Sequence, residues 1–125
     1  MTSRVVHPDP AKEFYTDERC YILESWNSSD DEALSIARAR VAPGVTTELH
    51  AVDGITERYL VVSGEAMMEI DGLPPARIVV GDVVVIAPGT PQRVTNAGTM
   101  DFVFYALCTP RFRPEAYRAV RAGSS

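Results

Sequence analysis

The sequence of 125 residues contains few of the residue types on which common catalytic sites depend. Its histidines are His7 and His50, its cysteines are Cys20 and Cys108, and Lys12 is its one lysine. Two histidines exclude a three-histidine centre built within one protomer. His50 is the one histidine inside the predicted domain, so no serine nucleophile has a second histidine to serve it. The cysteines lie far apart and are interpreted as small buried hydrophobic residues.

Long apolar runs and basic clusters are also absent. No apolar segment approaches the roughly 20 residues that span a bilayer, and the N-terminus lacks the apolar core of a secretory signal. We therefore expect no membrane partner and a cytoplasmic location. The net charge is −5 and the basic residues are scattered, which argues against a nucleic-acid partner. Because the chain has neither a P-loop nor a G-x-G-x-x-G motif, we expect no organic cofactor.

The chain length predicts a single domain flanked by two short segments. Residues 1–17 are polar and proline-containing, and are predicted to form an N-terminal arm. Residues 18–113 form the predicted β-barrel domain, and residues 114–125 a short C-terminal helix and tail, with Pro114 near the first helical position. His7 lies in the arm, and an arm exchanged between protomers would carry it to a partner's site.

Short runs rich in valine, isoleucine and threonine alternate with turn signals along the whole domain. Such spacing indicates an all-β sandwich or barrel rather than a mixed fold. The strands are predicted at residues 20–26, 34–41, 46–51, 57–63, 66–70, 77–80, 83–86, 92–96 and 101–109. Alternation places Glu57, Tyr59 and Val61 on one face of their strand.

Two blocks in the middle of the chain carry residues at regular spacing. The first block has Gly44, His50, Glu57 and Gly64 as its anchors, and the second has Gly81, Gly89, Gln92 and Asn96. His50 and Glu57 lie on consecutive predicted strands, and we expect these two strands to be neighbours. A neutral imidazole and a carboxylate that face each other can share a metal ion.

These blocks resemble the two motifs of the cupin superfamily, G-x5-H-x-H-x3-4-E-x6-G and G-x5-P-x-G-x2-H-x3-N. The first block matches at each of its four anchors, while the proline of the second motif falls one place late, at Pro88. The resemblance implies a jelly-roll barrel, or double-stranded β-helix. Val52 stands in place of the second histidine of the first motif, and Gln92 in place of the histidine of the second.

The resemblance implies a metal site with His50 and Glu57 as catalytic residues and as ligands, and with Gln92 as a third ligand through its amide oxygen. Val52 offers no donor. Manganese, iron, zinc and nickel are the candidate ions. The alternative is a metal-free site in which His50, Glu57 and Gln92 are joined by hydrogen bonds and a water molecule.

Further residues are predicted to line a ligand cavity. Tyr59 and Met68 share the inward phase of their strands, and Phe104 is a candidate from the last strand. Arg38 and Arg40 share one strand face, where they either contact an anionic ligand or lie at the surface.

The cupin resemblance leaves three functions open. The first is a small metal-dependent enzyme, such as a dioxygenase, isomerase or lyase, acting on a small molecule. The second is a non-catalytic module that binds or senses a small molecule. The third is a metal-free, epimerase-like enzyme with His50 as general base and Glu57 orienting it. We also expect a homodimer, in part because an apolar N-terminal segment, residues 21–26, offers a sheet edge for pairing.

Overall fold

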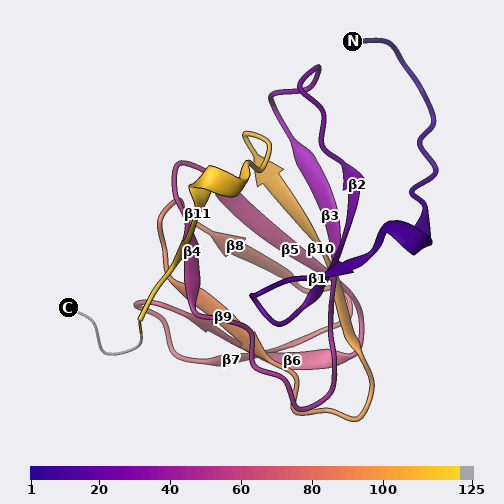
Figure 1. Ribbon diagram of the computed structural model, residues 1–125. Coiled ribbons are helices and arrows are strands. Elements are labelled where there is room, and N and C mark those ends of the chain that lie inside the picture. The colour runs from indigo at the N-terminus through magenta and orange to yellow at the C-terminus, as the bar shows by residue number, and fades with distance from the viewer. Residues whose placement is uncertain (122–125) are drawn as a thin grey trace.

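Two antiparallel sheets form the fold in the computed structural model, which describes residues 1–121 (Figure 1). One sheet has six strands, in the spatial order β1 (Phe14–Tyr15), β2 (Tyr21–Trp26), β3 (Ser35–Val41), β10 (Phe102–Thr109), β5 (Thr56–Ser63) and β8 (Val83–Ile86). The other has five, in the order β11 (Tyr117–Ala119), β4 (His50–Val52), β9 (Gln92–Thr95), β6 (Glu65–Ile70) and β7 (Ala76–Val79). The predicted all-β jelly roll is therefore confirmed.

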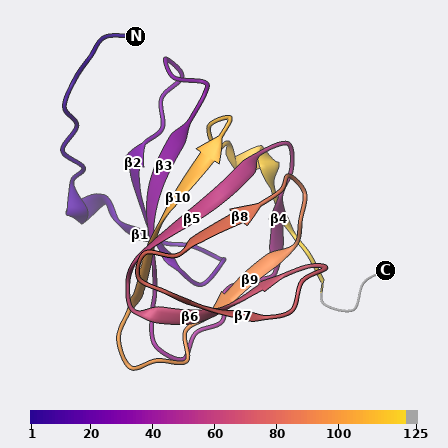
Figure 2. The ribbon, with the colours of Figure 1, turned by 180° about the vertical axis from the view of Figure 1, so that it is seen from behind.

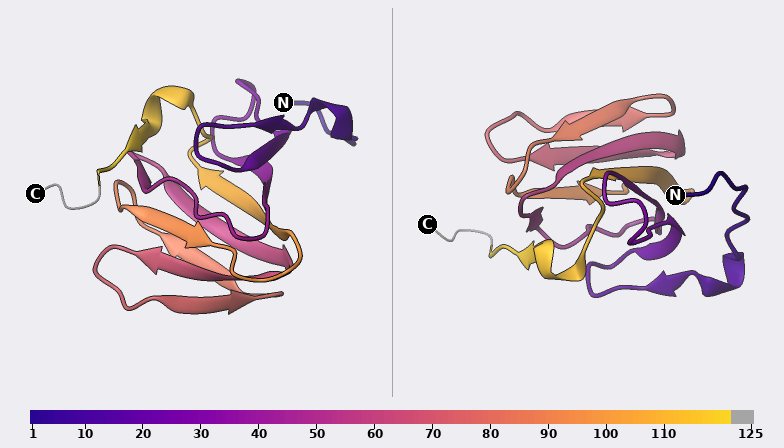
Figure 3. Two further views of the ribbon diagram at one scale, coloured as in Figure 1. Left: turned by 60° about the horizontal axis from the view of Figure 1, so that its bottom comes forward. Right: turned by 90° about the horizontal axis from the view of Figure 1, so that it is seen from above.

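The two sheets face each other and enclose the core between them (Figures 2 and 3). The core is apolar, and its largest fully buried members include Phe102, Ile86 and Val61. The predicted alternation holds along β5, where Glu57, Tyr59 and Val61 are buried while Leu60 and Val62 are partly exposed.

Turns at glycine connect the strands. Gly64 lies between β5 and β6 with φ of +78°, a conformation that residues with a side chain rarely adopt. A Cβ at this position would approach the backbone oxygen of Asp101 to 2.5 Å, so the turn also requires the close packing that glycine permits. No helix among residues 1–121 is long and apolar enough to cross a membrane.

The expectation that the His50 strand lies beside the Glu57 strand is wrong. β4 pairs with β9 and β11 in the five-stranded sheet, whereas β5 pairs with β10 and β8 in the six-stranded sheet. The turn at Asp53-Gly54 carries the chain from one sheet to the other instead of closing a hairpin. His50 and Glu57 therefore approach each other across the interior of the barrel.

The predicted C-terminal helix is also not formed. Pro114–Ala116 make one 3-10 turn, η2, and the chain then extends into β11 beside β4. Backbone pairing of residues 117–119 with residues 50–52 replaces the hydrogen bonds that a helix would have made. The end of the predicted helix and the tail, residues 122–125, lie outside the described residues.

The N-terminal segment also joins the sheet. After a 3-10 turn at Pro10–Lys12, η1, the short strand β1 pairs with β2 (Figure 1). Residues 21–26 therefore lie between β1 and β3, and the expectation that they form a sheet edge is wrong. The segment between β1 and β2 then passes over one end of the barrel, where Glu18 accepts a backbone hydrogen bond from Glu48. Residues from both ends of the chain therefore contribute to the site described next.

Candidate functional site

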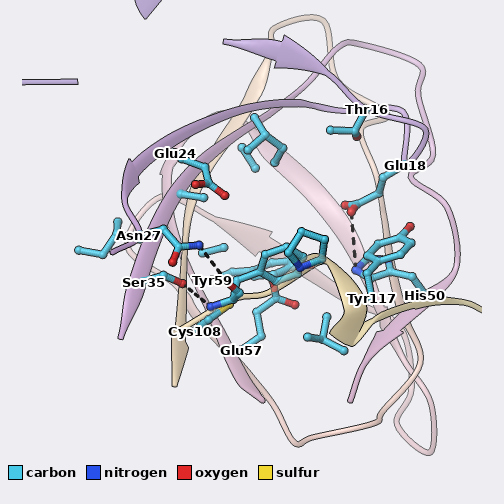
Figure 4. Close-up of a pocket in the computed structure, with 18 of the residues that line it drawn as sticks. Thr16, Glu18, Glu24, Asn27, Ser35, His50, Glu57, Tyr59, Cys108 and Tyr117 are labelled. Atoms are coloured by element: carbon cyan, nitrogen blue, oxygen red, sulfur yellow. Dashed lines mark hydrogen bonds and ion pairs between the residues drawn. The ribbon is translucent and has the colours of Figure 1, made fainter. Parts of the chain in front are cut away.

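A cavity of about 420 Å³ opens at one end of the barrel, a size typical of small-molecule sites (Figure 4). Its floor is made by inward-facing residues of β3, β4, β5 and β10. Its walls are completed by the segment around β1 and by the segment around η2. Both His50 and Glu57 line this cavity.

The imidazole of His50 is held in one orientation. The ring is 2% exposed, and its Nδ1 lies 2.8 Å from the backbone oxygen of Glu48. A carbonyl oxygen can only accept, so Nδ1 carries the hydrogen, and in the neutral ring the lone pair belongs to Nε2. Nε2 lies 3.9 Å from Oε1 of Glu18. The free nitrogen of His50 is therefore the one available to a ligand.

Glu57 belongs to a chain of buried hydrogen bonds. The hydroxyl of Tyr59 donates to Oε1 of Gln92, and Nε2 of Gln92 donates over 2.7 Å to Oε1 of Glu57. Gln92 is fully buried, and Glu57 is 9% exposed. The amide therefore links the phenol to the carboxyl and fixes both side chains.

Burial has a large effect on the acidity of Glu57. Loss of water contact raises the pKa of this carboxyl from its ordinary value of 4.5 to about 7. The Gln92 hydrogen bond and the attraction of His50 lower the pKa, while the Glu18 carboxylate raises it further. A carboxyl with this pKa exchanges protons near neutral pH, as a general acid or base must.

As placed, the predicted metal ligands do not fit a divalent ion. The Gln92 oxygen that would bind the ion accepts the Tyr59 hydroxyl, and Gln92 does not line the cavity. Within residues 1–121, no group of three His, Cys, Asp or Glu residues is arranged to hold a metal ion. The identity of an ion, whether Mn, Fe, Zn or Ni, stays a prediction, and no chemical step below depends on one.

The residues predicted to line a ligand cavity are divided between three environments. Tyr59 and Phe104 line the cavity and stack on each other, with ring centroids 4.1 Å apart. Met68 is buried in the apolar core. Arg38 and Arg40 form ion pairs with Glu13 and do not line the cavity. The proposed anion contact of these arginines therefore has no support in the geometry.

Three residues that the sequence did not indicate contribute to the site: Glu18, Glu48 and Tyr117. Glu18 precedes β2 and faces His50. Tyr117 stacks on His50 with ring centroids 4.9 Å apart, and its hydroxyl donates over 2.6 Å to Glu48. These contacts join segments that are distant in sequence, and no motif spacing relates them.

Comparisons with known proteins agree with this architecture. Residues 37–108, more than half of the chain, match the model of the cupin domain. A search of curated proteins finds no match. Similar solved structures include Streptomyces PAC13 with uridine, which has 18% sequence identity and a TM-score of 0.75. That match covers 98% of this chain and 95% of the other.

Two further solved structures have the same fold. A predicted oxalate decarboxylase from Thermotoga maritima is 23% identical with a TM-score of 0.69, covering 88% of this chain and 99% of its own. KdgF from Halomonas sp. is 17% identical with a TM-score of 0.71, and the match covers 81% of this chain and 89% of KdgF. Identities this low establish the shared fold and leave the chemistry to be argued from the site.

Proposed function

We propose that this chain, which belongs to the cupin domain family, binds a small organic molecule in its barrel cavity and catalyses proton transfer on it. The reaction class is isomerisation, epimerisation or elimination, in which a base removes a proton from carbon. His50 is the base and Glu57 the acid that supplies a proton to an oxygen of the ligand. The reaction requires no resident metal ion.

The observation that carries this proposal is the fixed tautomer of His50. Because Nδ1–H is donated to the Glu48 carbonyl, Nε2 presents its lone pair beside the cavity. When Nε2 takes a proton, the ring becomes positive, and the Glu18 carboxylate 3.9 Å away stabilises that charge. A base held by one partner and stabilised by another is the arrangement that general-base catalysis needs.

Glu57 supplies the complementary acid. Its raised pKa of about 7 leaves a substantial fraction of the carboxyl protonated at neutral pH. Its Oε1 is engaged by Gln92, while Oε2 accepts no hydrogen bond from residues 1–121 and is the oxygen free for a ligand. Base and acid with different environments in one cavity can act on the two ends of an H–C–C–O unit.

The similar structures support ligand binding more than any one reaction. PAC13 was solved with uridine, a small neutral organic molecule. One similar structure is a predicted oxalate decarboxylase, whose named substrate, oxalate, is a dianion. We do not extend that substrate to this chain, because no Arg or Lys of the described residues lines the cavity to bind a dianion.

Hydrogen exchange at carbon tests the proposal directly. The protein is incubated in D₂O with a panel of hydroxy-carbonyl compounds, nucleosides and amino alcohols, and deuterium incorporation is followed by proton NMR. We expect incorporation into at least one compound, and its loss in His50→Gln and Glu57→Gln. We also expect EDTA to leave the rate of deuterium incorporation unchanged, because the proposed reaction uses no metal ion.

A matched control separates catalysis from general effects. Asp71→Asn replaces a carboxyl group by an amide, as Glu57→Gln does, in an exposed turn between β6 and β7. It should exchange at the wild-type rate. Binding without exchange in the wild type would contradict the catalytic part and leave a non-catalytic binding module. Loss of exchange on EDTA treatment would indicate the metal-dependent alternative.

A further inference from the structure

We propose that the ligand is an organic cation, with an ammonium group attached to an apolar body. This inference rests on the proposed function, since it specifies the ligand class of the same cavity. Three features of the cavity lead to it: the sign of its charges, polar atoms at its floor that a ligand can reach, and the aromatic character of its walls.

The ionisable groups that line the cavity are almost all acidic. Asp17, Glu18 and Glu24 contribute three carboxylates, and Glu57 contributes a fourth carboxyl group that is partly protonated at neutral pH, against the single imidazole of His50. No Arg or Lys among residues 1–121 lines it. In a cleft with apolar walls, charges of one sign concentrate their field on the ligand. This cavity therefore attracts cations and repels anions.

Nearby arginines do not neutralise this charge, because they form ion pairs elsewhere. Arg40 pairs with Glu13 and Asp101, and Arg38 also pairs with Glu13. Arg111 and Arg113 both bind Glu32.

The floor of the cavity presents two polar atoms that form no hydrogen bond with the described residues. Glu57 is more than nine-tenths buried, and its Oε2 accepts no hydrogen bond from the described residues. Nε2 of His50, in a ring 2% exposed, likewise forms no hydrogen bond within residues 1–121. Both residues line the cavity and neither atom is fully buried, so a polar group of the ligand can reach both and hydrogen-bond to them.

Aromatic rings form much of the remaining wall. Phe14, Tyr59, Phe104, Phe112 and Tyr117 all line the cavity. Aromatic faces bind both an apolar body and an adjacent ammonium group, which is attracted by the negative face of the ring. Figure 4 shows the Glu18 and Glu24 carboxylates on opposite sides of the cavity, above the buried floor. An ammonium group at this rim leaves the reactive end of the ligand near His50 and Glu57.

Three probes with one aromatic body and different charges test the inference. Benzylamine is a cation at pH 7.5, benzyl alcohol is neutral and benzoate is an anion. Their dissociation constants are measured by isothermal titration calorimetry at low and at physiological salt. We expect benzylamine to bind at least about tenfold more tightly than benzyl alcohol, and benzoate more weakly than both. The preference for benzylamine should shrink as salt rises.

Glu24→Gln locates the effect. Glu24 is exposed at the rim and its side chain has no hydrogen-bond partner among the described residues, so the fold does not depend on it. The variant should weaken benzylamine several-fold and leave benzyl alcohol unchanged, while Asp71→Asn, remote from the cavity, should change neither.

The outcomes distinguish this inference from the proposed function. Equal affinity for the three probes, or tighter binding of benzoate, would overturn the cation preference and leave ligand binding standing. No binding of any probe at millimolar concentration would overturn the inferred ligand class, while the deuterium-exchange panel tests the proposed function separately. Equal weakening by Glu24→Gln and Asp71→Asn would show that net charge, and not the cavity rim, governs binding.

Discussion

Tyr117 lies face to face with His50, with ring planes inclined by 15° and centroids 4.9 Å apart. The contact joins β11 to β4 and covers the face of the imidazole on which the proposed chemistry depends. The hydroxyl of Tyr117 donates a hydrogen bond to Oε1 of Glu48. The backbone oxygen of the same glutamate accepts the hydrogen bond from Nδ1–H of His50. The C-terminal strand therefore fixes the base through its ring and through its hydroxyl.

The first prediction concerns this contact. Tyr117→Phe keeps the stacked ring and loses one hydrogen bond, so we expect a loss of about 1 kcal/mol in the free energy of unfolding. Tyr117→Ala removes the ring as well and should cost about 2–4 kcal/mol. Urea denaturation followed by circular dichroism measures both values.

The same pair of variants separates packing from positioning. If the ring orients His50, Tyr117→Phe retains deuterium exchange at carbon and Tyr117→Ala loses most of it. An equal loss of stability in the two variants would contradict a contribution from stacking.

Much of the fold could be predicted because its signals are local. Alternation along β5 placed Glu57, Tyr59 and Val61 on one face together, and in the structure this is the buried face. The glycine anchors Gly44, Gly64 and Gly81 all have positive φ, which few other residues adopt. Local chemistry of this kind requires no knowledge of distant contacts.

The errors arose where distant segments decide the outcome. Residues 114–119 begin with Pro114 and were predicted to be helical, but pairing with β4 makes residues 117–119 a strand. Gln92 occupies the position of a family histidine, yet its amide is engaged by Tyr59 and Glu57. Glu18 enters the site from a polar segment whose sequence carries no indication of a role. Such contacts are set by tertiary packing and not by spacing within a motif.

The second prediction follows from the raised pKa of Glu57. Between pH 4.5 and about 7, the folded protein keeps this carboxyl protonated while the unfolded chain ionises it. The folded state therefore binds more protons, and the free energy of unfolding falls as pH rises through this window. The decline contributed by one group is at most about 1.4 kcal/mol per pH unit.

Glu57→Gln tests that assignment. An amide does not titrate, and its oxygen can still accept from Gln92. We expect the variant to lose stability less steeply than the wild type between pH 5 and 7, and to be the more stable protein at pH 8. Asp71→Asn serves as the matched control. Parallel pH profiles for the wild type and Glu57→Gln would exclude a raised pKa at this residue.

The third prediction is a homodimer. β8 ends the six-stranded sheet, and Val83 and Val85 on its outer face are 60% and 63% exposed. Leu60 and Val62 continue this apolar surface on β5. Sedimentation velocity at micromolar concentration should give a species of twice the 13.7 kDa chain mass. Val85→Arg should shift it toward the monomer, whereas a wild-type monomer at every concentration would refute the dimer.

The last prediction concerns the missing metal ligand. Val52 lies on β4 two residues after His50, and its side chain lines the same cavity. Val52→His therefore adds an imidazole beside His50 and Glu57 without disturbing Gln92. Three donors that face one cavity suffice for a divalent ion with open coordination positions.

We expect the wild type, purified without a histidine tag and dialysed against Mn²⁺, Fe²⁺, Zn²⁺ or Ni²⁺, to retain little metal by elemental analysis. Val52→His should retain markedly more, and the gain should disappear when His50→Ala is added. Val52→Thr, which adds a hydroxyl without an imidazole, is the control. Stoichiometric metal in the wild type, lost in both His50→Ala and Glu57→Ala, would instead establish the metal site that the family resemblance implied. The Gln92 amide would then have to leave its hydrogen bond with Tyr59 to bind the ion.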